Sequence, residues 1–211
     1  MDIPENDLEK CVELANELCE YYNFDAMVNC TKKSLDDLIR FTRTFLGKDV
    51  QIKDLELRTN PDTTFRGVML PRNDTHYEIY VLKEADEDLR RLVTCKELFQ
   101  AALDSPDIRN LDLYDHISAL VYQDMQDPSL AVIAELMAEV AAMQFLYPYA
   151  DRVEDIKRIN EKQTSSEKIA ESYGIPLFYV EKYLTKKTMA ALQTSHGIKI
   201  ATNSDISKNK S

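Results

Sequence analysis

Two amphipathic helices are predicted from the hydrophobic spacing of the first 50 residues. In the first helix, apolar side chains recur at intervals of three and four residues, which is typical of a helix packed on one face. These apolar positions are Leu8, Cys11, Val12, Ala15, Leu18, Cys19 and Tyr22. The second helix begins after Ser34, whose hydroxyl suits an N-cap, and ends at Gly47.

Short segments with strand character follow between residues 51 and 82. The segment from Gln51 to Leu57 suits an edge strand, and two more strands are predicted from Phe65 to Val68 and from Tyr77 to Leu82. The last two are separated by a turn-forming segment from Pro71 to Asp74. We therefore expect a small three-stranded sheet.

The middle of the chain returns to helical spacing. Helices are predicted over residues 86–104, within residues 107–127 and over residues 129–147, where Pro148 ends the last of them. No internal repeat or glycine-rich phosphate loop is present. The expected fold class is α+β and mostly helical.

The C-terminal part has the spacing of a helix, a tight turn and a second helix between Ser166 and Leu184. A helix that reads DNA usually presents arginine, lysine, asparagine or glutamine, whereas the second helix here is mainly apolar. The composition favours a packing module over direct DNA binding. From Thr188 onwards the periodicity is lost, which predicts a disordered tail. The expected parts are therefore 1–150, 151–187 and 188–211.

The net charge of −11 is unevenly distributed along the chain. Residues 1–150 hold 29 acidic and 15 basic side chains, whereas residues 151–211 hold 8 acidic and 11 basic ones. An acidic body argues against broad binding to nucleic acid, because such binding depends on lysine and arginine. It suits a basic protein partner, or it simply keeps the protein soluble.

The sequence predicts a cytoplasmic protein that does not enter a membrane. No run of 18 apolar residues is present, and the acidic start of the chain lacks the layout of a signal peptide. The cysteines show no Cys-x-x-Cys spacing, so we expect buried thiols rather than disulfides or metal ligands. They are Cys11, Cys19, Cys30 and Cys95.

The helix over residues 86–104 carries the most informative motif. Zinc proteases place histidine, glutamate and histidine at positions 1, 2 and 5 of a helix, so that two imidazoles on one face bind the metal. The matching positions here are Lys96, Glu97 and Gln100, so that only the glutamate remains. Neither lysine nor glutamine is a suitable zinc ligand.

The order of these segments over residues 60–185 resembles the ImmA/IrrE family of metallopeptidases. The shared order is a strand pair, the motif helix, a helix with Glu-x-x-Ala that begins at Glu135, and a helix-turn-helix-like segment. The resemblance implies a zincin-like domain in which Glu97 is the general base and Glu135 the third metal ligand. The two histidine ligands fall on Lys96 and Gln100. His76, His116 and His196 do not recreate a ligand pair at helical spacing.

Each of these positions also has a structural interpretation. Glu97 is expected to be a vestigial base with a structural role, and Glu135 is expected to be structural or ion-paired. If the helices pack as the resemblance implies, the two carboxylates approach each other and need a cation. The ammonium of Lys96 either replaces the charge of the metal there or extends to solvent.

Two functions follow from the resemblance. The first is a catalytically inactive relative that holds no zinc and binds a protein, such as a helix-turn-helix repressor in a mobile element or a stress response. An extended segment of that partner would pair with an edge strand near Tyr77 to Leu82. The alternative is an active zinc metallopeptidase with an atypical site that includes Glu135 and cleaves a transcriptional regulator.

Overall fold

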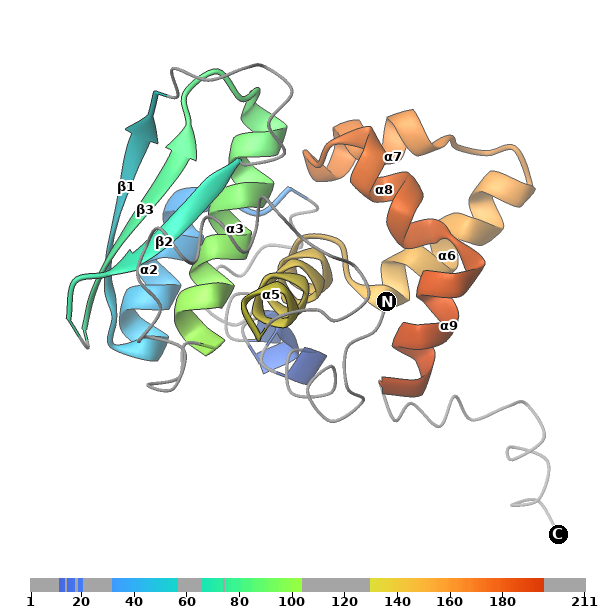
Figure 1. The fold of residues 1–211 in the computed structure, drawn as a ribbon. Coiled ribbons are helices and arrows are strands. Elements are labelled where there is room, and N and C mark those ends of the chain that lie inside the picture. Colours follow the sequence, from blue (N-terminus) through green and yellow to red (C-terminus); the bar gives the residue numbers. More distant parts are fainter. Residues whose placement is uncertain are drawn as a thin grey trace, which may run out of the picture.

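The computed structural model describes residues 12–20 except 14 and 18, residues 32–56, residues 66–103 except 74, and residues 130–195. Figure 1 shows the arrangement of these segments. Helical residues between 12 and 20 precede the labelled elements. These elements are α2 (Leu35–Leu46), β1 (Asp49–Leu55), β2 (Gly67–Pro71), β3 (His76–Leu82), α3 (Glu87–Leu103), α5 (Leu130–Leu146), α6 (Tyr149–Asn160), α7 (Ser166–Tyr173), α8 (Leu177–Leu184) and α9 (Lys186–Ser195).

The sheet is mixed and has the strand order β1-β3-β2. β1 runs parallel to β3, and β2 runs antiparallel to it. The prediction of an edge strand at Tyr77 to Leu82 is therefore wrong, because β3 lies in the centre. Strands adjacent in sequence suggest the order β1-β2-β3, but the parallel pairing of β1 with β3 inserts the last strand between the first two.

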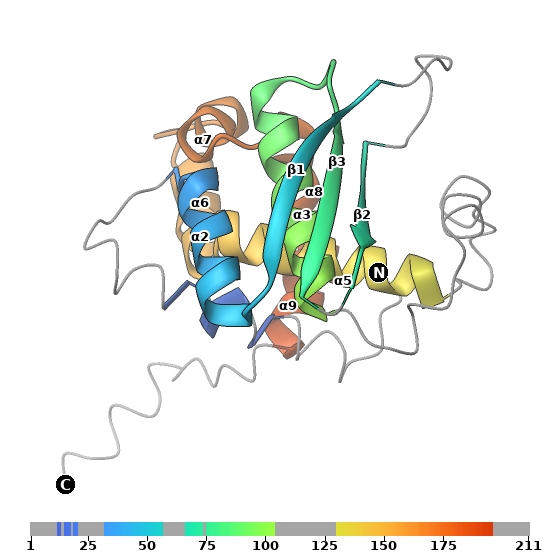
Figure 2. The same cartoon turned by 90° about the vertical axis from the view of Figure 1, so that its left-hand side faces the viewer.

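One face of the sheet packs against the helices. Tyr77, Ile79 and Val81 of β3 alternate along the strand and have no exposed surface. They point toward α3, which also packs against α2 and α5, and Figure 2 shows the helices gathered behind the sheet. The sheet thereby fixes the position of α3, and α3 in turn fixes that of α5.

Two buried cations from outside α5 complete its C-terminal end. α5 has no basic residue in its last turn, where carbonyl groups lack partners within the helix. The ammonium of Lys33 donates to the carbonyl of Phe145 at 2.7 Å, and Nε of Arg152 donates to that of Tyr147 at 2.7 Å. Because a cation near the negative end of the helix dipole is stabilising, both side chains stabilise the C-terminal end of α5.

The same device completes α3 and α7, which also lack a basic residue in their last turn. Lys48 donates to the carbonyl of Ala101 near the end of α3. Arg91 of α3 donates to the carbonyl of Tyr173 and, at 2.9 Å, to that of Gly174, which ends α7 in a left-handed conformation. Arg91 thereby ties the turn between α7 and α8 to the body of the protein.

The C-terminal helices pack on the body, but they do not end where the sequence suggested. α7 and α8 form the predicted pair of helices joined by a tight turn. The prediction of a disordered tail from Thr188 is wrong for residues up to Ser195, because α9 buries Met189 and Leu192. Two apolar positions three residues apart are enough for a helix that packs on a preformed surface. Residues 196–211 lie outside the described residues.

Most other elements confirm the sequence analysis. The helix after Ser34, the three-stranded sheet and the helices over 86–104 and 129–147 are present, and the fold is α+β and mostly helical. The helix expected within 107–127 lies outside the described residues, as do Cys11, Cys30, His116 and His196. Cys19 and Cys95 are free thiols; Cys95 is buried as predicted, whereas Cys19 is only partly buried. Among the described helices, none has both the length and the apolar character needed to cross a bilayer.

Candidate functional site

Four polar side chains meet between α3 and α5, and we call them the buried charge cluster: Lys96, Glu97, Gln100 and Glu135. Lys96 and Gln100 are four residues apart in α3 and therefore share one face of that helix. α5 packs along this face and brings Glu135 to both of them. The positions singled out by the motif thus lie together in the fold.

Lys96 connects the two carboxylates of the cluster. Its ammonium nitrogen lies 2.9 Å from Oε1 of Glu97, and it donates a hydrogen bond to Oε2 of Glu135. The amide nitrogen of Gln100 donates to the other oxygen of Glu135. Both oxygens of Glu135 are therefore satisfied, and the ammonium lies between the carboxylates instead of extending to solvent.

Glu97 is the most deeply buried member of the cluster. Its side chain has no exposed surface, whereas 18% of the Lys96 side chain and 15% of the Glu135 side chain are exposed. Within the described part of the chain, neither oxygen of Glu97 receives a well-directed hydrogen bond. The ammonium of Lys96 and the backbone N–H of Met69 nevertheless lie close enough to favour the charged carboxylate.

These surroundings shift the two pKa values in the same direction for different reasons. Burial is the main cause that raises the pKa of Glu97 to about 7. The charge of Glu135 raises this pKa further, and Lys96 offsets only part of the rise. Burial alone would lower the pKa of Lys96, but the charges of Glu97 and Glu135 outweigh burial and raise it above its usual value. The two carboxylates therefore favour the charged form of Lys96.

Strand β2 lies beside the cluster and forms an edge of the described sheet. Residues 66 and 72 are hydrogen-bonded to β3, so the alternation of an antiparallel pair turns the backbone groups of residues 67, 69 and 71 to the outer side. Gly67 allows β2 to lie close to α3, because a Cβ at this position would lie 2.4 Å from Val93 and 3.5 Å from Oε1 of Glu97. The cluster thus lies next to the side of β2 that does not pair with β3.

Helix α8 adjoins the cluster through α5. Glu139, one turn beyond Glu135, accepts hydrogen bonds from Lys182 and, at 2.9 Å, from the hydroxyl of Tyr183. Tyr179 of α8 is close enough for its pKa to respond to the charges of the cluster, although burial is the largest cause of its rise. Sequence reasoning missed these contacts, because the spacing within each helix does not show which helices meet.

The cluster does not fit a zinc ion. Of the three positions that the resemblance assigns to metal ligands, Glu135 alone has a side chain that suits zinc, and both of its oxygens are engaged by Lys96 and Gln100. No group of three or more histidine, cysteine, aspartate or glutamate side chains within the described residues could hold a metal. His76 lies on the outer face of the sheet, 3.3 Å from Asp49.

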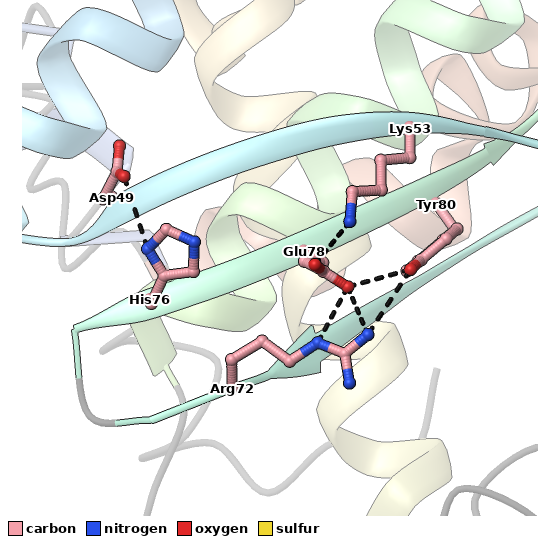
Figure 3. A network of polar contacts seen from close by, with 6 residues as sticks. All are labelled: Asp49, Lys53, Arg72, His76, Glu78 and Tyr80. Carbon is pink, nitrogen blue, oxygen red and sulfur yellow. Dashed lines mark hydrogen bonds and ion pairs between the residues drawn. The ribbon is translucent and has the colours of Figure 1, made fainter.

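A second charged network covers the outer face of the sheet, as Figure 3 shows. Glu78 of β3 accepts hydrogen bonds from Lys53 of β1, from Nε of Arg72 at 2.8 Å and from the hydroxyl of Tyr80 at 2.8 Å. These bonds, that of Arg72 first, lower the pKa of Glu78 to about 2. This network could not be predicted from the sequence, because it depends on the strand order and register that place Lys53 beside β3.

Comparisons of the chain with protein-family models, with curated proteins and with solved structures found no match.

Proposed function

We propose that this protein is a catalytically inactive relative of the ImmA/IrrE metallopeptidases that acts by binding a protein. One observation carries the proposal: the ammonium of Lys96 contacts both Glu97 and Glu135, the carboxylates to which the resemblance assigns the base and the third metal ligand. A permanent cation at that point supplies the charge that a metal would supply. It supplies no Lewis acid and no activated water, which zinc peptidases require.

The partner that suits this frame is a transcriptional regulator, as the resemblance implies. The body of the protein is acidic, with a net charge of −14 over residues 1–150, and such a body attracts a basic DNA-binding protein. The outer side of β2 offers backbone groups of residue 67 and the carbonyl of Met69 for pairing with an extended segment, whereas the N–H of Met69 faces Glu97. Pro71 has no N–H and limits that pairing at the end of the strand.

Zinc content tests the loss of the metal site. The protein purified in metal-free buffer is expected to contain far less than one zinc per chain, because two ligand positions hold unsuitable side chains. Elemental mass spectrometry gives the ratio. Tight binding near one zinc per chain, together with cleavage of a regulator, would support the alternative of an active metallopeptidase with an atypical site.

Restoring the ligands tests the assignment of the positions. The double variant Lys96→His and Gln100→His is expected to bind zinc, since Glu135 becomes free to supply the third ligand. The single variant Gln100→His is the matched control, because Lys96 still holds Glu135 in it. A folded double variant without zinc affinity would show that the positions carried over from the family are wrong.

A further inference from the structure

The first turn of α8 exposes an apolar patch formed by Leu177 and Phe178. Among the described residues, these are the large hydrophobic side chains left exposed, at 37% and 67% respectively. The ring of Phe178 meets that of Tyr179 edge-on, with centroids 5.6 Å apart. An exposed phenylalanine held in place by a neighbouring ring has little conformational freedom to lose when a partner covers it.

The remainder of α8 is fixed to the body, so this patch does not turn inward. Val180 and Tyr183 have no exposed surface, and Lys182 and Tyr183 bind Glu139 of α5. Arg91 holds the turn that precedes α8. The patch is therefore a fixed feature of the folded surface.

In DNA-binding proteins with this motif, the first residues of the second helix contact the edges of the bases. The corresponding side chains here are Leu177, Phe178 and Glu181. None of them donates a hydrogen bond to a base, and the carboxylate of Glu181 repels phosphate. The position that would read DNA therefore carries the chemistry of a protein contact.

One carboxylate lies beside the patch on α8, and two more lie near the turn that precedes it. Glu181 is exposed and lies three residues after Phe178, on the same side of α8. The first turn of α3 adds Glu87 and Asp88, which Lys32 contacts at 3.4 and 3.7 Å. Lys32 also reaches to 2.5 Å from a Cβ built on Gly174, so the acidic turn of α3 lies beside the turn into α8.

From this arrangement we infer that Leu177 and Phe178 form a docking site for a basic, amphipathic segment of a partner protein, with Phe178 as the anchor. Apolar side chains of that segment cover Leu177 and the rings of Phe178 and Tyr179. Its lysine or arginine side chains face Glu181, Glu87 and Asp88. The inference deepens the proposed function, because it names the surface of this protein that meets the partner and the chemistry of the segment that binds.

Fluorescence anisotropy with the full chain tests the site. The probe is a short labelled peptide of leucine and lysine at helical spacing, and its control has glutamate in place of lysine. The wild type is expected to bind the lysine peptide and not the glutamate peptide. Phe178→Ala is expected to weaken binding by about tenfold or more, as for an aromatic anchor. Because Phe178 is largely exposed, the variant should unfold at the wild-type temperature.

A pair of charge reversals separates this site from general attraction to an acidic protein. Glu181→Lys is expected to weaken binding several-fold, whereas Glu154→Lys on α6, an exposed carboxylate with side-chain exposure of 62%, should leave it unchanged. Equal loss in both variants would overturn the inference, as would wild-type affinity in Phe178→Ala or no binding of the lysine peptide.

Two further outcomes would assign the patch to another occupant and overturn the inference. One is tighter binding of a short DNA duplex than of the peptide. The other is self-association in light scattering that Phe178→Asp abolishes, which would make the occupant a second copy of this chain. The variants on α8 leave the buried charge cluster intact, so a failure here is distinct from a failure of the zinc tests.

Discussion

The buried charge cluster and the network on the outer face of the sheet both place a carboxylate among cations, yet they shift its pKa in opposite directions. Glu78 receives hydrogen bonds from two cations and a hydroxyl, and its pKa falls to about 2. Glu97 has one ammonium nearby and no exposed surface, and its pKa rises to about 7.

The difference follows first from the burial of Glu97 and then from the hydrogen bonds that Glu78 receives. Lys53 and Arg72 are 40% and 52% exposed, so they serve Glu78 without a large cost of desolvation. Lys96 is shared by two carboxylates, and Glu135 takes its hydrogen bond. Glu97 therefore has a cation nearby, but within the described residues no well-directed hydrogen bond offsets its burial.

Removal of the shared cation should have the largest effect. Lys96→Met keeps much of the volume but leaves Glu97 and Glu135 together without a cation. We expect the free energy of unfolding to fall by about 3–5 kcal/mol at pH 8, the range for a broken buried ion pair. The loss should shrink toward pH 5, because protonation of one carboxylate removes the repulsion. Urea melts at both pH values measure it.

The triple variant Lys96→Met, Glu97→Gln and Glu135→Gln is the control for that experiment. It removes the repulsion together with the cation, so part of the lost stability should return at pH 8. A loss below about 1 kcal/mol for Lys96→Met at both pH values, which is typical of exposed pairs, would contradict the contacts of the cluster.

The raised pKa of Glu97 predicts an effect of intermediate size. The folded state binds this proton more tightly than the unfolded state, whose glutamate has its ordinary pKa of 4.5. The resulting stability is fully present below pH 4.5 and is lost as the pH rises to about 7, a difference on the order of 3 kcal/mol. Glu97→Gln should lack this fall, and urea melts from pH 4 to 8 compare the two proteins. Parallel curves would refute the shift.

Glu78 should give the smallest effect and the opposite dependence on pH. Its folded pKa lies below the ordinary value, so its contribution is present above pH 4.5 and is lost as the pH falls toward 2. Glu78→Gln should therefore be less stable than the wild type at pH 7, by less than Lys96→Met. The stabilities of Glu78→Gln and the wild type should converge in acid, and thermal melts measure both. A variant as stable as the wild type at pH 7 would mean that the network only orders the surface.

The fold was predictable where local spacing decides it. The apolar periodicity of α3 and α5 and the alternation in β3 identify these elements directly. The order of the strands was not predictable, because pairing in space, and not proximity in sequence, places β3 in the centre. Helix α9 was not predicted, because two buried apolar residues are too few to show a helical period. Among its residues with described side chains, these are Met189 and Leu192.

The candidate site followed from the sequence only in part. The motif positions predict that Lys96 and Gln100 share a helical face, and the resemblance adds Glu135. The direction of the Lys96 side chain could not be predicted from the sequence, because it depends on how closely α5 packs against α3. The hydrogen bonds from Lys33, Arg91 and Arg152 to helix ends could not be predicted for the same reason. Each depends on packing between segments that no sequence motif links.

The caps on the helix ends have a consequence for synthesis on the ribosome. Lys48 precedes Ala101 by 53 residues, Arg91 precedes Gly174 by 83 and Lys33 precedes Phe145 by 112. In each long-range pair the cation is translated first and stays hydrated until its carbonyl emerges. Helix ends can then be completed in the order α3, α5 and α7. A nascent chain that stops before Tyr173 lacks both carbonyl acceptors that Arg91 binds at the end of α7, although the carbonyl of Lys33 is already present. We therefore expect α7 to dock on the body only after Gly174 has left the exit tunnel.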